Sequence, residues 1–228
     1  MVIAIQQPEH LPWLGFFNKM AIVDEFIYLD NVQFKKRYFE NRNKIKAANK
    51  NGWEWLTVPV VTKDRYTQDI NEVEIDYTQD WQRKYINKIR QNYGESRFFP
   101  EIFAEIEIII NKRFNRLFEL NLALINFFKS YLGILTPAIL ASSFSNGKGS
   151  DLILDLCLKR KADTYLSGPD GRNYLLLEAF QRNKIRVEYH DYVHPVYTQK
   201  YGPFISHMSI VDLIFNYGSD SKKIIRNE

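Results

Sequence analysis

The 228-residue sequence lacks several features that mark whole classes of protein. It has a single cysteine, Cys157, which excludes an internal disulfide and a thiolate-rich metal site and is typical of the reducing cytoplasm. No uncharged apolar run approaches the roughly 18 residues that would span a membrane. The N-terminus also lacks the basic and small-residue regions of a secretory signal. The sequence therefore predicts a cytoplasmic protein without a membrane span.

Internal repeats, low-complexity segments and linkers rich in Pro, Gly or Ser are also missing. We therefore expect residues 1–228 to form a single domain. The excess of one charge sign over the other is also small: 31 basic and 27 acidic residues give a net charge of +4. This mildly basic balance suits anionic small molecules and is too weak to predict nucleic-acid binding by itself.

Aromatic residues, in contrast, are abundant at 15% of the chain, with 14 Tyr, 16 Phe and 4 Trp. Such a sequence has enough rings to fill a core and to line a ligand pocket.

Short apolar runs alternate with helical patterns at both ends of the chain, which is typical of an α/β fold with a mostly parallel sheet and flanking helices. The predicted strands are 2–6, 25–30, 55–61, 70–75, 136–141, 164–167 and 185–189. The predicted helices are 15–21, 81–93, 101–131, 150–161 and 174–182. We expect the helix-rich middle segment to act as a cap or lid. The basic stretch Gln33–Asn51 shows neither the periodicity of a helix nor that of a strand.

Ligands of open parallel sheets bind beyond the carboxyl ends of the strands. Four segments with unusual residues follow predicted strands: Gln6–Gly15, Asp30–Asn43, Ser142–Gly149 and Ser167–Tyr174. We expect these four segments to converge on one crevice that holds a diphosphate-bearing molecule.

In the first segment, Pro12 begins a helix whose free N–H groups favour an anion, and Gln7 and His10 add donors. Histidines occupy similar loops in nucleotidyl-transferring enzymes. A rigid aromatic loop packed on the core is the alternative interpretation.

In the second segment, Asp30 ends a strand and can bind a ribose or a metal. The stretch Lys35–Lys46 holds six basic residues interleaved with aromatic rings, and arginine suits phosphate oxygens. A solvated charge run and a single-stranded RNA site are the alternatives.

The third segment is a Ser- and Gly-rich loop before a helix, where backbone donors can meet a phosphate. In the fourth segment Gly168 and Gly171 allow a close backbone approach to a ligand, and Ser167, Arg172 and Tyr174 offer polar contacts. Neither segment has the spacing of a P-loop or of the dinucleotide-binding fingerprint. For the third segment, a plain capped turn is the alternative.

Near the C-terminus, His207 and Asp212 are candidates for a proton-transfer pair, with capping and core roles as the alternative. The four histidines do not have the spacing of a zinc site, and we predict no metal site. The candidate catalytic residues are His10, His207 and Asp212. The candidate substrate-binding residues are Gln7, Trp13, Asp30, Gln33, Lys35, Arg37, Arg42, Asn43, Ser143, Ser167, Gly168, Gly171, Tyr174 and Gln199.

Short motifs along nearly the whole chain, from Met1 to about Gly218, share the order and spacing of one family. They are Gln6-Gln7-Pro8, Pro12-Trp13, Gly15-Phe16-Phe17, Val32-Gln33-Phe34, Asn41-Arg42-Asn43-Lys44-Ile45, Leu56-Thr57-Val58-Pro59-Val60, Ser167-Gly168, Tyr197-x-Gln199 and Ser209-Ile210-x-Asp212. The sequence thus resembles the WbqC-like protein family. It departs from the pattern at His10, where the family pattern has Tyr or Phe, so a role of His10 would be particular to this protein.

The resemblance implies a cytoplasmic transferase of bacterial surface-polysaccharide (O-antigen, lipopolysaccharide) biosynthesis. Its substrate would be a nucleotide-linked amino sugar that receives an acyl or aminoacyl (glycyl) group. The resemblance supplies no catalytic residues. Two alternatives stay open: a nucleotidyltransferase-like enzyme that uses ATP with magnesium to activate a carboxylate or phosphate, and a non-catalytic nucleotide- or RNA-binding module.

Overall fold

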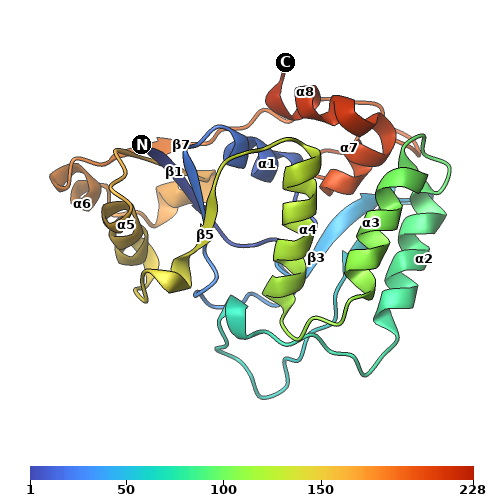
Figure 1. Cartoon of the computed structure of the whole chain (residues 1–228), viewed down its shortest axis with the longest axis horizontal. Helices are drawn as coiled ribbons and strands as arrows, with labels where there is room; N and C mark the ends of the chain where they lie inside the picture. The colour runs from blue at the N-terminus through green and yellow to red at the C-terminus, as the bar shows by residue number, and fades with distance from the viewer.

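Five short apolar segments form one parallel sheet in the computed structural model, which describes residues 1–228 (Figure 1). The strands are β1 (Val2–Gln6), β2 (Glu25–Tyr28), β5 (Ala138–Leu140), β6 (Thr164–Ser167) and β7 (Arg186–Tyr189). They lie in the order β5-β2-β1-β6-β7, and every neighbouring pair is parallel. The α/β fold with a parallel sheet is therefore confirmed.

Both faces of this sheet are covered by helices, because side chains of a strand alternate between the faces. Ala4 points to the face that is covered by α1 (Leu14–Ala21) and α4 (Leu117–Tyr131). Ile3 and Ile5 point to the other face, which is covered by α5 (Gly149–Lys159) and α6 (Leu177–Arg182). Figure 1 shows these two pairs of helices on opposite sides of the sheet.

The strand order reverses between β1 and β6. From β1 the chain builds outward through β2 to β5, and it then returns past β1 to add β6 and β7 on the other side. The loops that follow β1 and β6 therefore run in opposite directions. Ligands of doubly wound sheets usually bind where the strand order reverses in this way.

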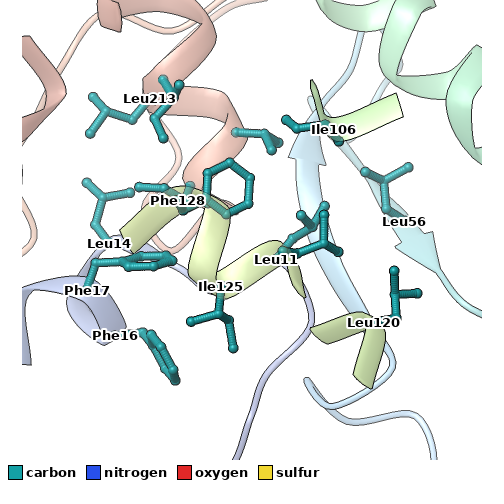
Figure 2. Close-up of a cluster of buried hydrophobic side chains, with 14 of the residues drawn as sticks. Leu11, Leu14, Phe16, Phe17, Leu56, Ile106, Leu120, Ile125, Phe128 and Leu213 are labelled. Atoms are coloured by element: carbon teal, nitrogen blue, oxygen red, sulfur yellow. The ribbon is translucent and has the colours of Figure 1, made fainter. Parts of the chain in front are cut away.

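The long segment between β2 and β5 is built into the main core. It contains a two-stranded antiparallel hairpin, β3 (Arg42–Lys46) with β4 (Trp53–Thr57), followed by α2 (Trp81–Tyr93), α3 (Phe99–Asn111) and α4. Figure 2 shows side chains of this segment packed with α1 and with α7 (Ile210–Tyr217), and the labelled ones include Phe17, Ile106 and Phe128. The last helix, α8 (Ser221–Arg226), contacts α1.

Four short 3₁₀ turns complete the structure: η1 (Ile70–Glu72), η2 (Ala141–Ser143), η3 (Pro169–Asn173) and η4 (Gly218–Asp220). None of the helices has the length and the apolar character that crossing a membrane requires.

The structure corrects three of the predicted elements. The predicted helix 101–131 is two helices, because the chain between α3 and α4 runs extended beside Val73, whose carbonyl accepts from Leu117 N at 2.8 Å. The predicted strand 70–75 begins as the turn η1 and forms only isolated bridges. The stretch 33–51 contains the strand β3, which was not predicted because its residues are mostly basic or polar.

Replacing Phe128 by alanine tests the packing of α4 on α1. The Phe128 ring is fully buried and lies edge-on to Phe17, with 6.0 Å between centroids. We expect Phe128→Ala to lower the free energy of unfolding by about 3–5 kcal/mol, because the contacts of the ring are lost and a cavity remains in the core. Urea unfolding measures this change.

The matched control is Leu135→Ala, since Leu135 is 92% exposed. It should change the free energy of unfolding by less than about 0.5 kcal/mol. Equal unfolding midpoints for the two variants would contradict the packing of Phe128 between α4 and α1.

Candidate functional site

A cleft of about 980 Å³ opens at the carboxyl edge of the sheet, where the strand order reverses. The loops after β1, β2, β6 and β7 line it, together with the first turns of α1 and α5. Its volume lies at the upper end of the range of roughly 300–1,000 Å³ that is typical of ligand sites. No residue of α2, α3 or α4 lines the cleft, so the expectation that the helix-rich middle segment caps the site is wrong.

A buried lysine lines the cleft. Lys19 lies on α1 and is only 2% exposed, and its Nζ donates to Gln6 Oε1 at 3.1 Å. The backbone of the β6 loop lies close to this cation, since a Cβ added to Gly168 would lie 3.8 Å from Nζ. An ammonium has three N–H donors, and Gln6 uses one of them. Burial lowers the pKa of Lys19 to about 8, while Glu9 opposes this shift.

Gln6 connects this lysine to a carboxyl group. Its Nε2 donates to Glu9 Oε1 at 2.8 Å, while Glu9 Oε2 is buried without a hydrogen-bond partner. Burial raises the pKa of Glu9 to about 7. The cleft therefore holds a cation and an acid that are joined through one amide.

His190 follows β7 and lies beside Lys19. Its Nε2 contacts Asn18 Oδ1 at 2.7 Å, and Asn18 Nδ2 donates to the carbonyl of Ile225. Because Asn18 Oδ1 can only accept, Nε2 carries the proton and Nδ1 keeps its lone pair. Burial and the charge of Lys19 lower the pKa of His190 to about 4, which keeps the ring neutral.

Aromatic rings form much of the remaining wall. The Trp13 ring packs at 4.7 Å from His207, and Tyr192 stacks on His190 at 5.7 Å. A Cβ on Gly15 would lie 2.2 Å from the Trp13 ring. The glycine therefore lets the indole lie flat against the start of α1.

The structure brings one group of the predicted site residues together in this cleft. They are Gln7, Trp13, Lys35, Gly168, Gly171, Tyr174 and His207. The first, second and fourth predicted segments therefore meet here, and the third contributes Gly149.

Sequence reasoning missed Gln6, Glu9, Lys19 and His190. The one available signal was a lysine in a short, mostly apolar helix, at a position that faces inward.

His10 lies outside the cleft and is fully buried. Its Nδ1 contacts Asn121 Oδ1 at 2.9 Å, and its Nε2 contacts the Tyr85 hydroxyl at 2.6 Å. Asn121 also donates to the carbonyls of Pro8 and Glu40. Burial lowers the pKa of His10 to about 4. His10 therefore ties the β1 loop to α2 and α4, and in this position it does not reach a ligand in the cleft.

The predicted pair of His207 and Asp212 does not form. Asp212 is buried and accepts hydrogen bonds from the hydroxyls of Tyr93 at 2.8 Å and Tyr197 at 2.9 Å. The Nδ1 atom of His207 instead contacts Ser206 Oγ at 2.9 Å. Burial raises the pKa of Asp212 to about 6, because the charged carboxylate is removed from water in the core.

Three further candidates hold loops together outside the cleft. Asp30 accepts from the backbone N and the Oγ of Ser142 at 2.9 and 2.6 Å, and from Asn71. Both of its carboxylate oxygens are thus engaged, which does not fit a metal ligand. Asn43 donates to the carbonyl of Leu11 at 2.8 Å, and Gln199 both donates to and accepts from the backbone of Ile205.

The remaining candidates also lie outside the residues that line the cleft. Ser167 is buried and donates to the carbonyl of Gly168, and Gln33 donates to the carbonyl of Tyr66. Ser143 and Arg37 are exposed, and Arg42 lies on the β3–β4 hairpin.

Two matched substitutions separate a structural histidine from a cleft histidine. His10→Phe leaves the buried Asn121 Oδ1 and the Tyr85 hydroxyl without their partner, and it should lower the free energy of unfolding by about 1–3 kcal/mol. His207→Phe, at an exposed position, should leave that energy nearly unchanged. Urea unfolding of both variants checks this difference, and a stable His10→Phe protein would contradict the role assigned to His10.

Comparison with known proteins agrees with the motifs of the sequence. An uncharacterized protein of Mycobacterium tuberculosis is 38% identical over 230 residues, which cover 98% of this chain and 97% of that protein. No solved structure matches the chain. The sequence pattern of the WbqC-like protein family matches residues 7–224, nearly the whole chain, and the protein therefore belongs to this family.

Proposed function

We propose that the protein is a transferase that attaches an acyl or aminoacyl group, such as glycyl, to the amino group of a nucleotide-linked sugar. The biological setting would be bacterial surface-polysaccharide assembly. The observation that carries this proposal is the buried Lys19, which has no carboxylate partner, in the same cleft as the Glu9 carboxyl. A nucleotide-linked amino sugar has both groups that such a cleft would bind, namely phosphates and an amine.

Lys19 supports the binding of the phosphates. A buried ammonium that lacks an anionic partner is costly, and a phosphate supplies the missing charge. Lys35 adds a second cation to the cleft wall. Gly168 lines the cleft beside Lys19, so backbone of the β6 loop lies close to the same point.

The aromatic wall supports the binding of flat rings. Trp13, Tyr174 and Tyr192 line the cleft, and such rings bury large apolar faces against a base or a sugar. The volume of about 980 Å³ leaves room for more than a small anion.

Glu9 is the residue best suited to remove a proton from the amine. In the proposed reaction the amine nitrogen attacks the carbonyl carbon of an activated acyl donor, and a C–N bond forms. The bond from that carbon to the leaving group breaks, and the leaving group takes the electron pair. The proton of the nitrogen passes to Glu9. A carboxyl with a pKa of about 7 is a suitable base near neutral pH.

The nucleotidyltransferase alternative depends on the loop after the first strand and its histidine. His10 is buried outside the cleft and bound by Asn121 and Tyr85, so it does not support this alternative.

Removing the lysine charge tests the phosphate site. Lys19→Met should weaken binding of dTDP and UDP by about 10- to 100-fold at pH 7, because a charge-assisted hydrogen bond is lost. In the unsubstituted protein, affinity for both should fall as the pH rises from 7 to 9, since Lys19 loses its proton near pH 8. Isothermal titration calorimetry measures both effects.

The matched control is Lys84→Met, at an exposed position on α2. It should bind both nucleotides as the unsubstituted protein does, with the same pH dependence. Unchanged affinity in Lys19→Met would remove Lys19 from the binding site and with it the main support for the proposal.

Glu9→Gln tests the base. The variant should still bind the nucleotide sugar, and it should form product about 10²- to 10⁴-fold more slowly, which is the usual contribution of a general base. Mass spectrometry of N-acylated product would follow the reaction with dTDP- and UDP-linked amino sugars and a set of activated acyl donors. Glu178→Gln, at an exposed position on α6, serves as the control. Full activity of Glu9→Gln would exclude Glu9 as the base.

A further inference from the structure

The outer face of the β3–β4 hairpin carries cations stacked on tryptophan rings. The guanidinium of Arg42 lies 4.0 Å from the centroid of Trp55, and Lys44 Nζ lies 4.6 Å from Trp53 and 5.5 Å from Trp55. Lys44 and Trp55 are paired across the two strands. We call these four residues, Arg42, Lys44, Trp53 and Trp55, the hairpin platform.

The platform side chains all lie on the face of the hairpin that points away from the core. Their strand neighbours Asn43 and Leu56 are paired with each other and are fully buried. Because successive strand residues point to opposite faces, Arg42, Lys44 and Trp55 lie on the outer face. All four platform residues are half-buried, and Arg42 Nε is buried without a hydrogen-bond partner.

The two cations of the platform have no acidic partner. Arg42 donates to the carbonyl of Arg37, and neither Arg42 nor Lys44 takes part in an ion pair. The one acidic residue of the hairpin, Glu54, pairs instead with Lys88 at 2.9 Å and accepts from Asn92 at 2.7 Å. The platform therefore attracts anions and offers flat surfaces for stacking.

The C-terminal loop blocks one end of the platform. Lys46 Nζ donates to the carbonyl of Pro203 at 2.8 Å, and the Ile205 side chain would lie 3.1 Å from a Cβ added to Gly52. Each strand of the hairpin is only five residues long. The free surface therefore accommodates a single ring with its phosphates better than a run of stacked bases.

The other end of the platform lies beside the cleft. Phe39 lines the cleft and packs 6.2 Å from Trp55. His207 also lines the cleft, and burial and the charge of Lys44 lower the pKa of His207. The platform and the cleft are therefore neighbouring surfaces, with Phe39 and His207 between them.

We propose that the hairpin platform binds the nucleotide moiety of the second substrate, which carries the group to be transferred. Its base would stack against the platform, on the Arg42 guanidinium and the tryptophan rings beside it. Its phosphates would bind Lys44, and the activated acyl group would extend past Phe39 toward Glu9. That the nucleotide belongs to the group donor rests on the proposed function, whereas nucleotide binding by the platform does not.

The test uses AMP as the probe in the Lys19→Met protein, so that the phosphate site of the cleft no longer contributes. Titration calorimetry should show that Arg42→Ala in this background weakens AMP binding at least about 10-fold, since stacking is typically worth about 1–3 kcal/mol per base. Arg83→Ala, on the exposed side of α2, is the matched control and should leave AMP affinity unchanged.

Tryptophan fluorescence supplies a second readout. AMP should quench the emission of the Lys19→Met protein, and Trp55→Phe should remove most of the quenching. Trp81→Phe should retain it, because Trp81 is buried on α2. Equal AMP affinity and equal quenching in the platform variants and in the control variants would overturn the proposal.

An oligouridylate of ten nucleotides distinguishes the RNA alternative. If it binds the platform far more tightly than UMP does, and if its affinity falls steeply with salt, the platform is an RNA site and the proposal is overturned. Equal affinity of the oligouridylate and UMP supports a site for one nucleotide. Loss of AMP binding in Arg42→Ala, together with unchanged dTDP binding in Lys19→Met, would support the platform while contradicting the proposed function.

Discussion

The reversal of strand order between β1 and β6 is the constraint on which the site depends. The helix that follows β1 packs on one face of the sheet, and the helices that precede and follow β6 pack on the other. The loops at the carboxyl ends of these two strands therefore separate, and no helix fills the space between them. The cleft is the consequence, and α1 starts at its edge.

Burial inside this fold gives ordinary side chains the chemistry of a site. Lys19 and Glu9 have pKa values shifted toward neutrality because both have left water, and Gln6 holds the two groups in a fixed relation. A lysine and a glutamate on an open surface would be permanently charged at neutral pH. Here each lies close enough to its titration point for a ligand to change its protonation.

The same polar residue types serve two purposes in this protein, and the sequence alone does not separate them. His10, Asn43 and Asp212 lie beside the predicted strands and helices as ligand-binding residues would, yet each satisfies buried amide, backbone or hydroxyl groups. Buried polar groups need partners, so a long loop consumes many of its own polar side chains. Lys19 was missed for the opposite reason, because a lysine in a helix is usually solvated.

By itself the sequence determined the parallel α/β architecture, the family, and the loops after β1, β2 and β6 that line the site. Those features follow from local patterns: apolar alternation, glycine and proline positions, and motif spacing. Only the tertiary structure decided which side chains face the cleft, that the middle helices join the core, and that β3 pairs with β4. These depend on contacts between residues distant in sequence, such as His10 with Asn121, which no local pattern records.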